Sequence, residues 1–210
     1  MAPVTVLIPL GGLGTRFTKE GYLQPKPFIN VLGKPMILWV LDSLKLCAND
    51  AVVIVYDPSF IAPKFWEPIA SAYPNLVLVE LDGPTRGAAE TVMLGLSGVP
   101  RALRERPVML IDGDTFYEED IVSQYREAST TTNAVFYFVD TQPQPLYSYI
   151  VFDDSARISQ VKEKVKISDH ANTGCYCFMR GVELESQCRA LLEAGATQLS
   201  QDAVGEFYTS

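Results

Sequence analysis

The sequence has few of the residues that build metal and redox centres. Its 210 residues include a single histidine, His170, and four cysteines, none of them in a C-x-x-C spacing. A structural zinc site needs several closely spaced cysteine or histidine ligands, so the pattern argues against one. Cys175 and Cys177 are two residues apart in an apolar run, and the alternation of a strand predicts that both point to one side as small buried side chains. Free cysteines favour a reducing, cytoplasmic compartment.

Basic residues and long apolar runs are also scarce. The chain has 17 Lys and Arg residues against 25 Asp and Glu residues, a net charge of −8, which disfavours nucleic acids and anionic membranes as partners. The weakly charged segment 129–152 contains threonines, glutamines and two prolines, so it is unsuited to a bilayer-spanning helix. No basic residue precedes the first apolar stretch, and the N-terminus therefore does not resemble a secretory signal.

The residues that are present have the composition of one globular domain, with 48% hydrophobic and 20% charged residues. Apolar β-branched runs alternate with amphipathic segments over the first 128 residues. Helices that separate buried strands require parallel crossovers, and hence an α/β sheet covered on both faces. The predicted strands are 4–10, 52–56, 76–80 and 108–111, and the predicted helices are 35–46, 60–73, 88–96 and 118–128. The 60–73 helix is expected to be interrupted near Pro63 and Pro68.

The pattern changes after residue 133, where strand-like runs follow one another with only loops between them. We expect these runs to add antiparallel strands to the parallel sheet, or to form a small flap beside it, within the same domain. The predicted fold is a three-layer α/β/α, Rossmann-like structure with a mixed, mainly parallel sheet. The later strands are 134–139, 147–152, 158–163 and 174–179, and the single domain of residues 1–210 has two halves, 1–130 and 131–210.

A glycine-rich loop follows the first predicted strand. Residues 11–16 read Gly-Gly-Leu-Gly-Thr-Arg, and a backbone with so little side-chain bulk can direct several N–H groups toward phosphate oxygens. Arg16 adds a planar, always-charged donor for the same oxygens. The spacing is neither that of a Walker A loop nor that of the dinucleotide fingerprint. A tight turn without a ligand is the alternative interpretation.

A framed lysine lies ten residues further on, in Pro25-Lys26-Pro27. The two prolines restrict the backbone and hold the lysine at a set reach from the glycine loop, although a solvated turn would also explain the tripeptide. Residues 11–34 contain four basic residues and one acidic residue. This local excess of positive charge in an acidic chain indicates a small polyanionic ligand.

Two carboxylates follow the strand that ends at Ile111, in Asp112-Gly113-Asp114. Ligands of open α/β sheets bind at the carboxyl ends of the strands, where this segment and the glycine loop both lie. One or two carboxylates suit Mg²⁺, which keeps its other positions for water and substrate phosphates. The pair therefore predicts a magnesium site on Asp112 and Asp114, with an Asx turn as the alternative.

The glycine loop, Pro25-Lys26-Pro27 and Gly113-Asp114 together resemble the sugar-phosphate nucleotidyltransferases, the nucleotide-diphosphosugar pyrophosphorylases. The resemblance includes Gly21-Tyr22 and residues 33–36 (Gly-Lys-Pro-Met), covers nearly the whole chain, and is strongest toward the branch that serves capsule and surface polysaccharides. It implies that the first half binds a nucleoside triphosphate and the β-rich second half binds the acceptor, a sugar 1-phosphate.

The resemblance also implies roles for individual residues. Arg16, Lys26 and Asp114 would be catalytic, with Mg²⁺ on Asp112 and Asp114. The implied nucleotide contacts are Leu10, Gly11, Gly12, Gly14, Thr15, Arg16, Gly87, Ala88 and Asp112. The implied acceptor contacts are Gly113, Tyr149, Glu163, Lys164, Asn172 and Gly174.

Two features depart from the family pattern. Many relatives have Tyr-Gly where this chain has Tyr147-Ser148-Tyr149, which fills the space that the glycine would leave for a sugar. The family also places a second acidic metal ligand on a late strand. Here Asp202 is the only late aspartate, in a different context, and the chain ends at Ser210 in an expected helix. We therefore expect either a truncated polypeptide or an incomplete metal site.

The expected reaction joins a nucleoside triphosphate to a sugar 1-phosphate and releases pyrophosphate. A cytidylyltransferase acting on a non-sugar phosphate, a metal-dependent glycosyltransferase and a catalytically silent nucleotide-binding module are the alternatives. The sequence leaves open which base is used, which acceptor is used, and whether the chain forms a homo-oligomer.

Overall fold

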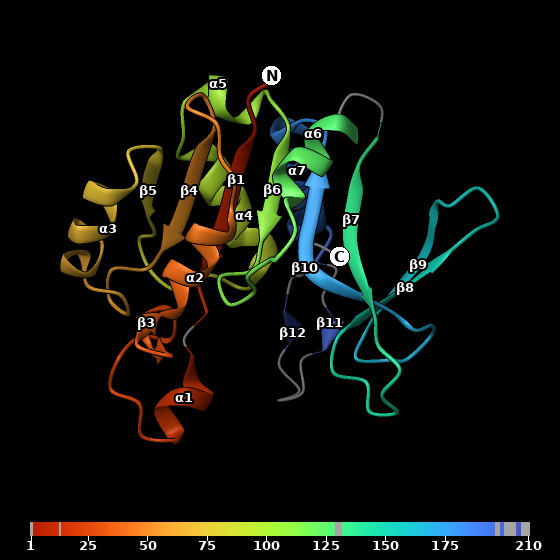
Figure 1. Ribbon diagram of the computed structural model, residues 1–210, viewed down its shortest axis with the longest axis horizontal. Coiled ribbons are helices and arrows are strands. Elements are labelled where there is room, and N and C mark those ends of the chain that lie inside the picture. The colour runs from red at the N-terminus through yellow and green to blue at the C-terminus, as the bar shows by residue number, and fades with distance from the viewer. Residues whose placement is uncertain (1, 13, 129–131, 196–197, 200–204, 207–210) are drawn as a thin grey trace.

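The structure, a computed structural model, describes residues 2–12, 14–128, 132–195, 198–199 and 205–206. These residues form a mixed sheet of eight strands with helices on both faces, as Figure 1 shows. The arrangement confirms the predicted fold class. In spatial order the strands are β5 (Leu76–Glu80), β4 (Ala51–Tyr56), β1 (Thr5–Leu10), β6 (Val108–Ile111), β10 (His170–Phe178), β8 (Ser148–Phe152) and β9 (Ile158–Glu163), and β7 (Ala134–Val139) pairs with β10.

The first half of the chain forms the parallel part of the sheet. β1 pairs in parallel with β4 and β6, and β4 pairs in parallel with β5. Every residue of β4 is buried, as its apolar, β-branched sequence predicts for a strand covered on both faces. Successive side chains of β1 point to opposite sides, so Val6 and Ile8 lie in one core while Leu7 lies in the other.

Two helical layers cover the sheet. One core lies beneath α2 (Met36–Ser43), α3 (Glu67–Ala72) and α6 (Ile121–Ala128), and the other beneath α4 (Ala88–Ser97) and α7 (Gly181–Glu193). The helix predicted to begin at Pro35 stops at Ser43, because Leu44 takes an extended backbone conformation. The 60–73 segment is interrupted near Pro63, as predicted, and forms a 3-10 turn, η2 (Pro63–Phe65), followed by α3. Pro68 does not interrupt α3, because it lies in the first turn, where proline is tolerated.

The second half adds the antiparallel strands, as expected. β10 begins at His170, four residues earlier than predicted. Its register against β7 shifts between Asn172 and Tyr176, a β-bulge around Gly174, whose φ is +81°. On its other edge, β10 pairs with β8 at Ala171, on the amino-terminal side of the bulge. It pairs with β6 at Cys175–Phe178, on the carboxyl-terminal side. The sheet therefore divides at Gly174, beside the carboxyl end of β6.

Several short elements carry no periodic signal in the sequence and were not predicted. Leu32 and Gly33, with φ of 53° and 84°, form the tight turn between β2 and β3. A helix reaching the chain end is not seen in the described part, where α7 ends at Glu193. The short elements are α1 (Thr15–Lys19), η1 (Lys26–Phe28), β2 (Asn30–Val31), β3 (Lys34–Pro35), α5 (Arg101–Arg104), β11 (Gln198–Leu199) and β12 (Gly205–Glu206).

Within the described ranges, no helix combines the length and the apolar character that crossing a bilayer requires.

Candidate active site

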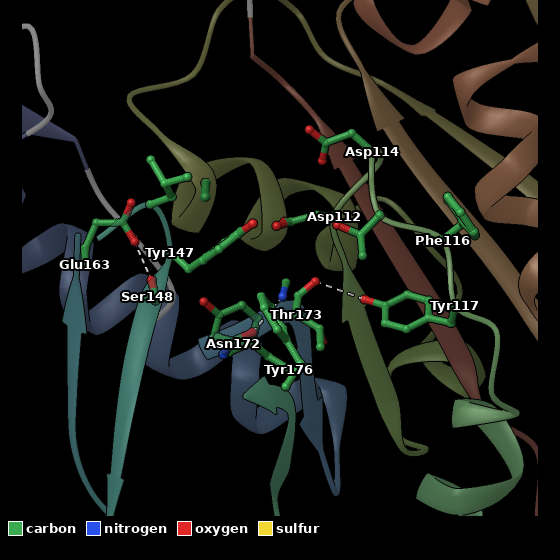
Figure 2. A pocket seen from close by; sticks show the side chains of 15 residues that line it. Asp112, Asp114, Phe116, Tyr117, Tyr147, Ser148, Glu163, Asn172, Thr173 and Tyr176 are labelled. Atoms are coloured by element: carbon green, nitrogen blue, oxygen red, sulfur yellow. Dashed lines mark hydrogen bonds between the residues drawn. The ribbon is translucent and has the colours of Figure 1, made fainter. Parts of the chain in front are cut away.

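A cavity of about 710 Å³ opens where the sheet divides (Figure 2). Its residues come from the loop after β6, the first residue of α4, the segment that enters β8, and the strands β7, β9 and β10. It lies at the edge where the parallel strands end, which is the usual ligand edge of an open α/β sheet. The lining residues are Ala88, Asp112, Asp114, Thr115, Phe116, Tyr117, Phe138, Leu146, Tyr147, Ser148, Glu163, Asn172, Thr173, Gly174 and Tyr176.

Asp112 is positioned by the bulge in β10. Its backbone N–H donates to the carbonyl oxygen of Gly174 at 3.0 Å. A Cβ atom at Gly174 would lie 2.2 Å from Asp112 Oδ2, and the positive φ of Gly174 also disfavours any other residue. The absence of a side chain at position 174 therefore makes room for the Asp112 carboxylate.

The surroundings of Asp112 disfavour its negative charge. Asp112 as a residue is partly exposed, but protein surrounds most of its carboxylate, and this burial raises its pKa to about 7. The neighbouring Asp114 and Glu163 carboxylates raise the pKa further, whereas Lys26 lowers it. A cation bound between the carboxylates would relieve this repulsion.

Lys26 pairs with Asp114, one of the residues that line the cavity. Lys26 Nζ lies 2.5 Å from Asp114 Oδ2, although 88 residues separate the two in the sequence. Both side chains are partly exposed. Lys26 begins the 3-10 turn η1. Gly14 packs against it, because a Cβ atom added at Gly14 would lie 3.3 Å from the Cβ atom of Lys26. The fold thus brings the framed lysine, the glycine loop and the Asp-Gly-Asp segment together.

The glycine loop packs against the start of α4. A Cβ at Gly11 would lie 2.5 Å from Thr91 Oγ1, whereas Gly12 has open space around it. The N–H of Thr91 donates to the carbonyl oxygen of Gly87 at 3.2 Å. Ala88, the next residue, lines the cavity. The two segments assigned to the nucleotide, 11–16 and 87–88, are therefore adjacent.

The remaining residues assigned to the nucleotide loop lie around this contact. Gly14 has a φ of +61° and precedes α1, which begins at Thr15 and contains Arg16. Arg16 is not among the residues that line the cavity. Leu10 is the last residue of β1. A Cβ atom added at Gly113 would lie only 2.4 Å from Leu10 Cδ2. Gly113 thus packs tightly against Leu10 and is not among the lining residues either.

Three of the predicted acceptor residues line the cavity: Glu163, Asn172 and Gly174. Asn172 Oδ1 accepts a hydrogen bond of 2.7 Å from the Gly174 N–H. The Asn172 side-chain NH₂ group is buried and has no partner among the described residues, so it can donate to a ligand. Ser148 Oγ donates to Glu163 Oε2, which orients the glutamate in the cavity.

Besides Gly113, two predicted acceptor residues do not line the cavity. Tyr149 has no exposed surface, and its hydroxyl donates to Asp140 Oδ2 at 2.6 Å inside the protein. Because neighbouring strand residues point to opposite faces, it is Ser148 that faces the cavity. Lys164 is not a lining residue, and its Nζ lies 3.4 Å from Glu163 Oε1.

The sequence analysis named Tyr147 as part of a departure from the family pattern but missed the other apolar residues of the cavity. Figure 2 shows the Tyr147 side chain extending toward Asp112, and Phe116 and Tyr117 on the opposite side. Phe138 and Leu146 complete this apolar part of the lining. No local motif identifies them, because a single aromatic residue in a strand or loop is more often part of a core.

The donor set of Asp112 and Asp114 fits a magnesium ion, which commonly uses one or two carboxylates together with water and substrate phosphates. In the described part of the chain no three His, Cys, Asp or Glu side chains converge on a common point. Asp202, the other candidate ligand, lies outside the described residues.

Known proteins are similar to this chain in sequence and in fold. A family model described as "Nucleotidyl transferase" matches residues 5–202. A protein of Arabidopsis thaliana named "Probable mannose-1-phosphate guanylyltransferase 2" is 29% identical over 184 residues, which cover 81% of this chain and 49% of the relative. The bifunctional protein GlmU of Heliobacterium modesticaldum is 27% identical over 216 residues, which cover 97% of this chain and 42% of the relative. The chain thus spans about half the length of these relatives or less.

A solved structure shares the fold. The crystal structure of a nucleoside-diphosphate-sugar pyrophosphorylase from Vibrio cholerae is similar with a TM-score of 0.71 and 22% identity. The match covers 97% of this chain and 84% of the other.

Proposed function

Because the chain belongs to the nucleotidyl transferase family, we propose that it transfers a nucleotidyl group from a nucleoside triphosphate to a sugar 1-phosphate. Pyrophosphate is the second product. The observation that carries this proposal is the meeting of Lys26 and Asp114 beside the glycine loop, with Glu163 and Asn172 in the same cavity. A phosphate-binding cation, a metal-binding carboxylate and polar acceptor contacts are thereby available to one reaction.

The acceptor phosphate is itself the nucleophile. The second pKa of a phosphate monoester is about 6, so the acceptor is largely ionised at neutral pH and needs no protein base. The protein must instead bring two anions together and stabilise the charge on the α-phosphate and on the departing pyrophosphate. The lack of a histidine in the cavity lining is consistent with this chemistry.

We assign that stabilisation to two basic residues, Lys26 and Arg16, and to a metal ion on Asp112 and Asp114. Lys26 would exchange Asp114 for the phosphates of the nucleotide, and Arg16 would contact the same phosphates. Asp112 and Asp114 would hold Mg²⁺, which when bound neutralises phosphate charge. The backbone N–H groups of the glycine loop would hold the triphosphate, and Gly87 and Ala88 would lie against the base.

The acceptor would occupy the half of the cavity lined by β8, β9 and β10. Glu163, oriented by Ser148, would accept hydrogen bonds from sugar hydroxyls, and the Asn172 amide would donate one. The resemblance to the capsule and surface-polysaccharide branch makes nucleotide-sugar supply in the cytoplasm the expected use of the product.

The test is a matrix of nucleoside triphosphates against sugar 1-phosphates and non-sugar phosphates, with nucleotide sugars as a further set of substrates, with and without Mg²⁺, followed by pyrophosphate release. We expect Lys26→Ala, Arg16→Ala and Asp114→Ala to lower turnover about 10²–10³-fold, the usual effect of losing one preorganised charge. Lys64→Ala is the matched control, because Lys64 also lies in a proline-containing 3-10 turn. It lines a different pocket, with Phe65 and Pro68, whereas Lys26 pairs with Asp114 of the active-site cavity.

Near-normal pyrophosphate release by the Lys26 or Asp114 variants would contradict the proposal. The alternatives give different results in the same matrix. Consumption of a nucleotide sugar without release of pyrophosphate indicates a glycosyltransferase. Turnover restricted to CTP and a non-sugar phosphate indicates a cytidylyltransferase with a non-sugar acceptor. Nucleotide binding without any turnover indicates a silent module.

A further inference from the structure

Three apolar side chains lie exposed together in the acceptor half of the cavity. Phe138 is 40% exposed, Leu146 49% and Tyr147 40%, and all three line the cavity. The rings of Phe138 and Tyr147 meet edge to face, with centroids 5.0 Å apart. We call this surface, made by the end of β7 and the segment that enters β8, the apolar wall.

The apolar wall faces the ligand space and is not an unfilled part of the core. Along β7, Phe138 lines the cavity, whereas its neighbour Tyr137 packs on Phe152 and His170, with ring centroids 5.2 and 4.9 Å away. This is the alternation of a strand whose two faces have different environments. No described residue covers the wall, so whatever fills the cavity also contacts it.

The rest of the acceptor half is polar and acidic. Glu163, Ser148 and Asn172 supply hydrogen-bonding groups, whereas the apolar wall supplies none beyond the Tyr147 hydroxyl. No lysine or arginine occurs among the described lining residues. A hydroxyl group pressed against the wall would lose its water without a replacement partner, and a carboxylate on the acceptor would be repelled by the cavity carboxylates.

We propose that the acceptor is a deoxy sugar 1-phosphate, in which a methyl or methylene group replaces a hydroxyl-bearing group and contacts the apolar wall. Its remaining hydroxyls would face Glu163 and Asn172. This inference rests on the proposed function and names the substrate class of the same site. It assigns substrate selection to Phe138 and Leu146, two residues that take no part in holding the phosphates.

The experiment compares matched acceptors. Hexose 1-phosphates of gluco, manno and galacto configuration are each paired with their 6-deoxy counterpart, and with the corresponding uronic acid. With the preferred nucleotide, we expect kcat/KM for pyrophosphate release to be about 10-fold or more higher for a 6-deoxy sugar than for its parent, the usual discrimination of an apolar subsite. The uronic acids should be the poorest acceptors.

The wall is tested by substitution. Phe138→Ser and Leu146→Ser should each reduce the preference for the deoxy sugar over its parent to about threefold or less. Val139→Ser is the matched control, because Val139 follows Phe138 in the same strand and is 65% exposed but does not line the cavity. It should keep the wild-type preference.

Equal kcat/KM for parent and deoxy sugars, or a preference that survives Phe138→Ser and Leu146→Ser together, overturns the inference while leaving the proposed function intact. If no pair releases pyrophosphate, the proposed function fails, and calorimetric titration of the same sugar 1-phosphates decides the inference. Binding of a deoxy sugar at least 10-fold tighter than its parent supports it. Equal or absent binding overturns it.

Discussion

Gly174 shows how a single residue can control the geometry of the cavity floor. It lies in the bulge of β10 with a φ of +81°, and a Cβ at this position would overlap the Asp112 carboxylate. Two separate physical constraints therefore act at one position, namely a left-handed backbone and a lack of space. Gly33 has almost the same φ, +84°, but no neighbouring atom within 4 Å, so the two constraints can be measured separately.

We expect Gly33→Ala to lower the free energy of unfolding by about 1–2 kcal/mol, the cost of a left-handed conformation for a residue with a Cβ. Gly174→Ala should cost about 1–3 kcal/mol more because of the collision. It should also lower turnover about 10²-fold, because displaced Asp112 no longer aligns the reacting groups. Denaturant titration and pyrophosphate release measure the two effects. Similar behaviour of the two variants would contradict this account of Gly174.

At the scale of elements, a buried ion pair joins the amino-terminal side of the sheet to a covering helix. Asp50, just before β4, accepts hydrogen bonds of 2.8 Å from Arg126 Nη2 in α6 and from the N–H of Val4 before β1. The Asp50 side chain is fully buried, and that of Arg126 is 7% exposed. Burial alone would raise the pKa of Asp50, but the bonds from Arg126 and from backbone N–H groups outweigh burial and lower it.

This pair predicts how stability depends on pH. Because the pKa of Asp50 is lower in the folded protein, its contribution is complete above the unfolded pKa of about 4 and is lost as the pH falls through the folded value. Asp50→Asn should therefore cost about 3–5 kcal/mol at pH 7 and progressively less below about pH 4. Denaturant titrations at several pH values measure the difference.

The exposed pair of Arg101 and Glu105 provides the control. Their side chains are 78% and 39% exposed, so Glu105→Gln should change the free energy of unfolding by less than about 1 kcal/mol. A cost of Asp50→Asn that stays constant down to pH 3 would show that the ionised pair is not the source of the stability.

At the scale of the whole molecule, the two halves of the sequence share one sheet. Residues from the second half enter it through β10, which pairs with β6 of the first half at Cys175–Phe178. The core of one face likewise combines Cys175 and Cys177 with β1 and α2 of the first half. Neither half could keep its buried surface without the other, so the single-domain organisation predicted from the sequence implies cooperative unfolding.

We expect one unfolding transition, whichever half is observed. Both tryptophans, Trp39 and Trp66, belong to the first half and report on it by fluorescence. Cys175, Cys177 and Cys188 are buried in the second half, and burial raises the pKa of Cys188 to about 11, so these thiols should resist alkylation until that half unfolds. The two probes should give the same denaturant midpoint, whereas separated midpoints would indicate two domains.

The success of sequence reasoning varied with the range of the interactions involved. The strand at 76–80 and the β6 strand at 108–111 form at their predicted bounds, because their apolar runs are local signals. Tyr149 was wrongly expected in the cavity, since a shift of one residue along β8 exchanges the two faces of the sheet. The partnership of Asp50 and Arg126, 76 residues apart, has no local signal at all.

The sequence by itself determined the class of fold, the family and the chemical groups available, since periodicity, glycine loops and paired carboxylates are encoded within short segments. Only the tertiary structure decided that the bulge at Gly174 divides the sheet and leaves room for Asp112. It alone gathered the apolar wall beside Glu163, from residues whose separate signals are those of ordinary strands and loops. The physical reason is that a cavity depends on the register and curvature of strands distant in sequence, and local patterns do not specify either.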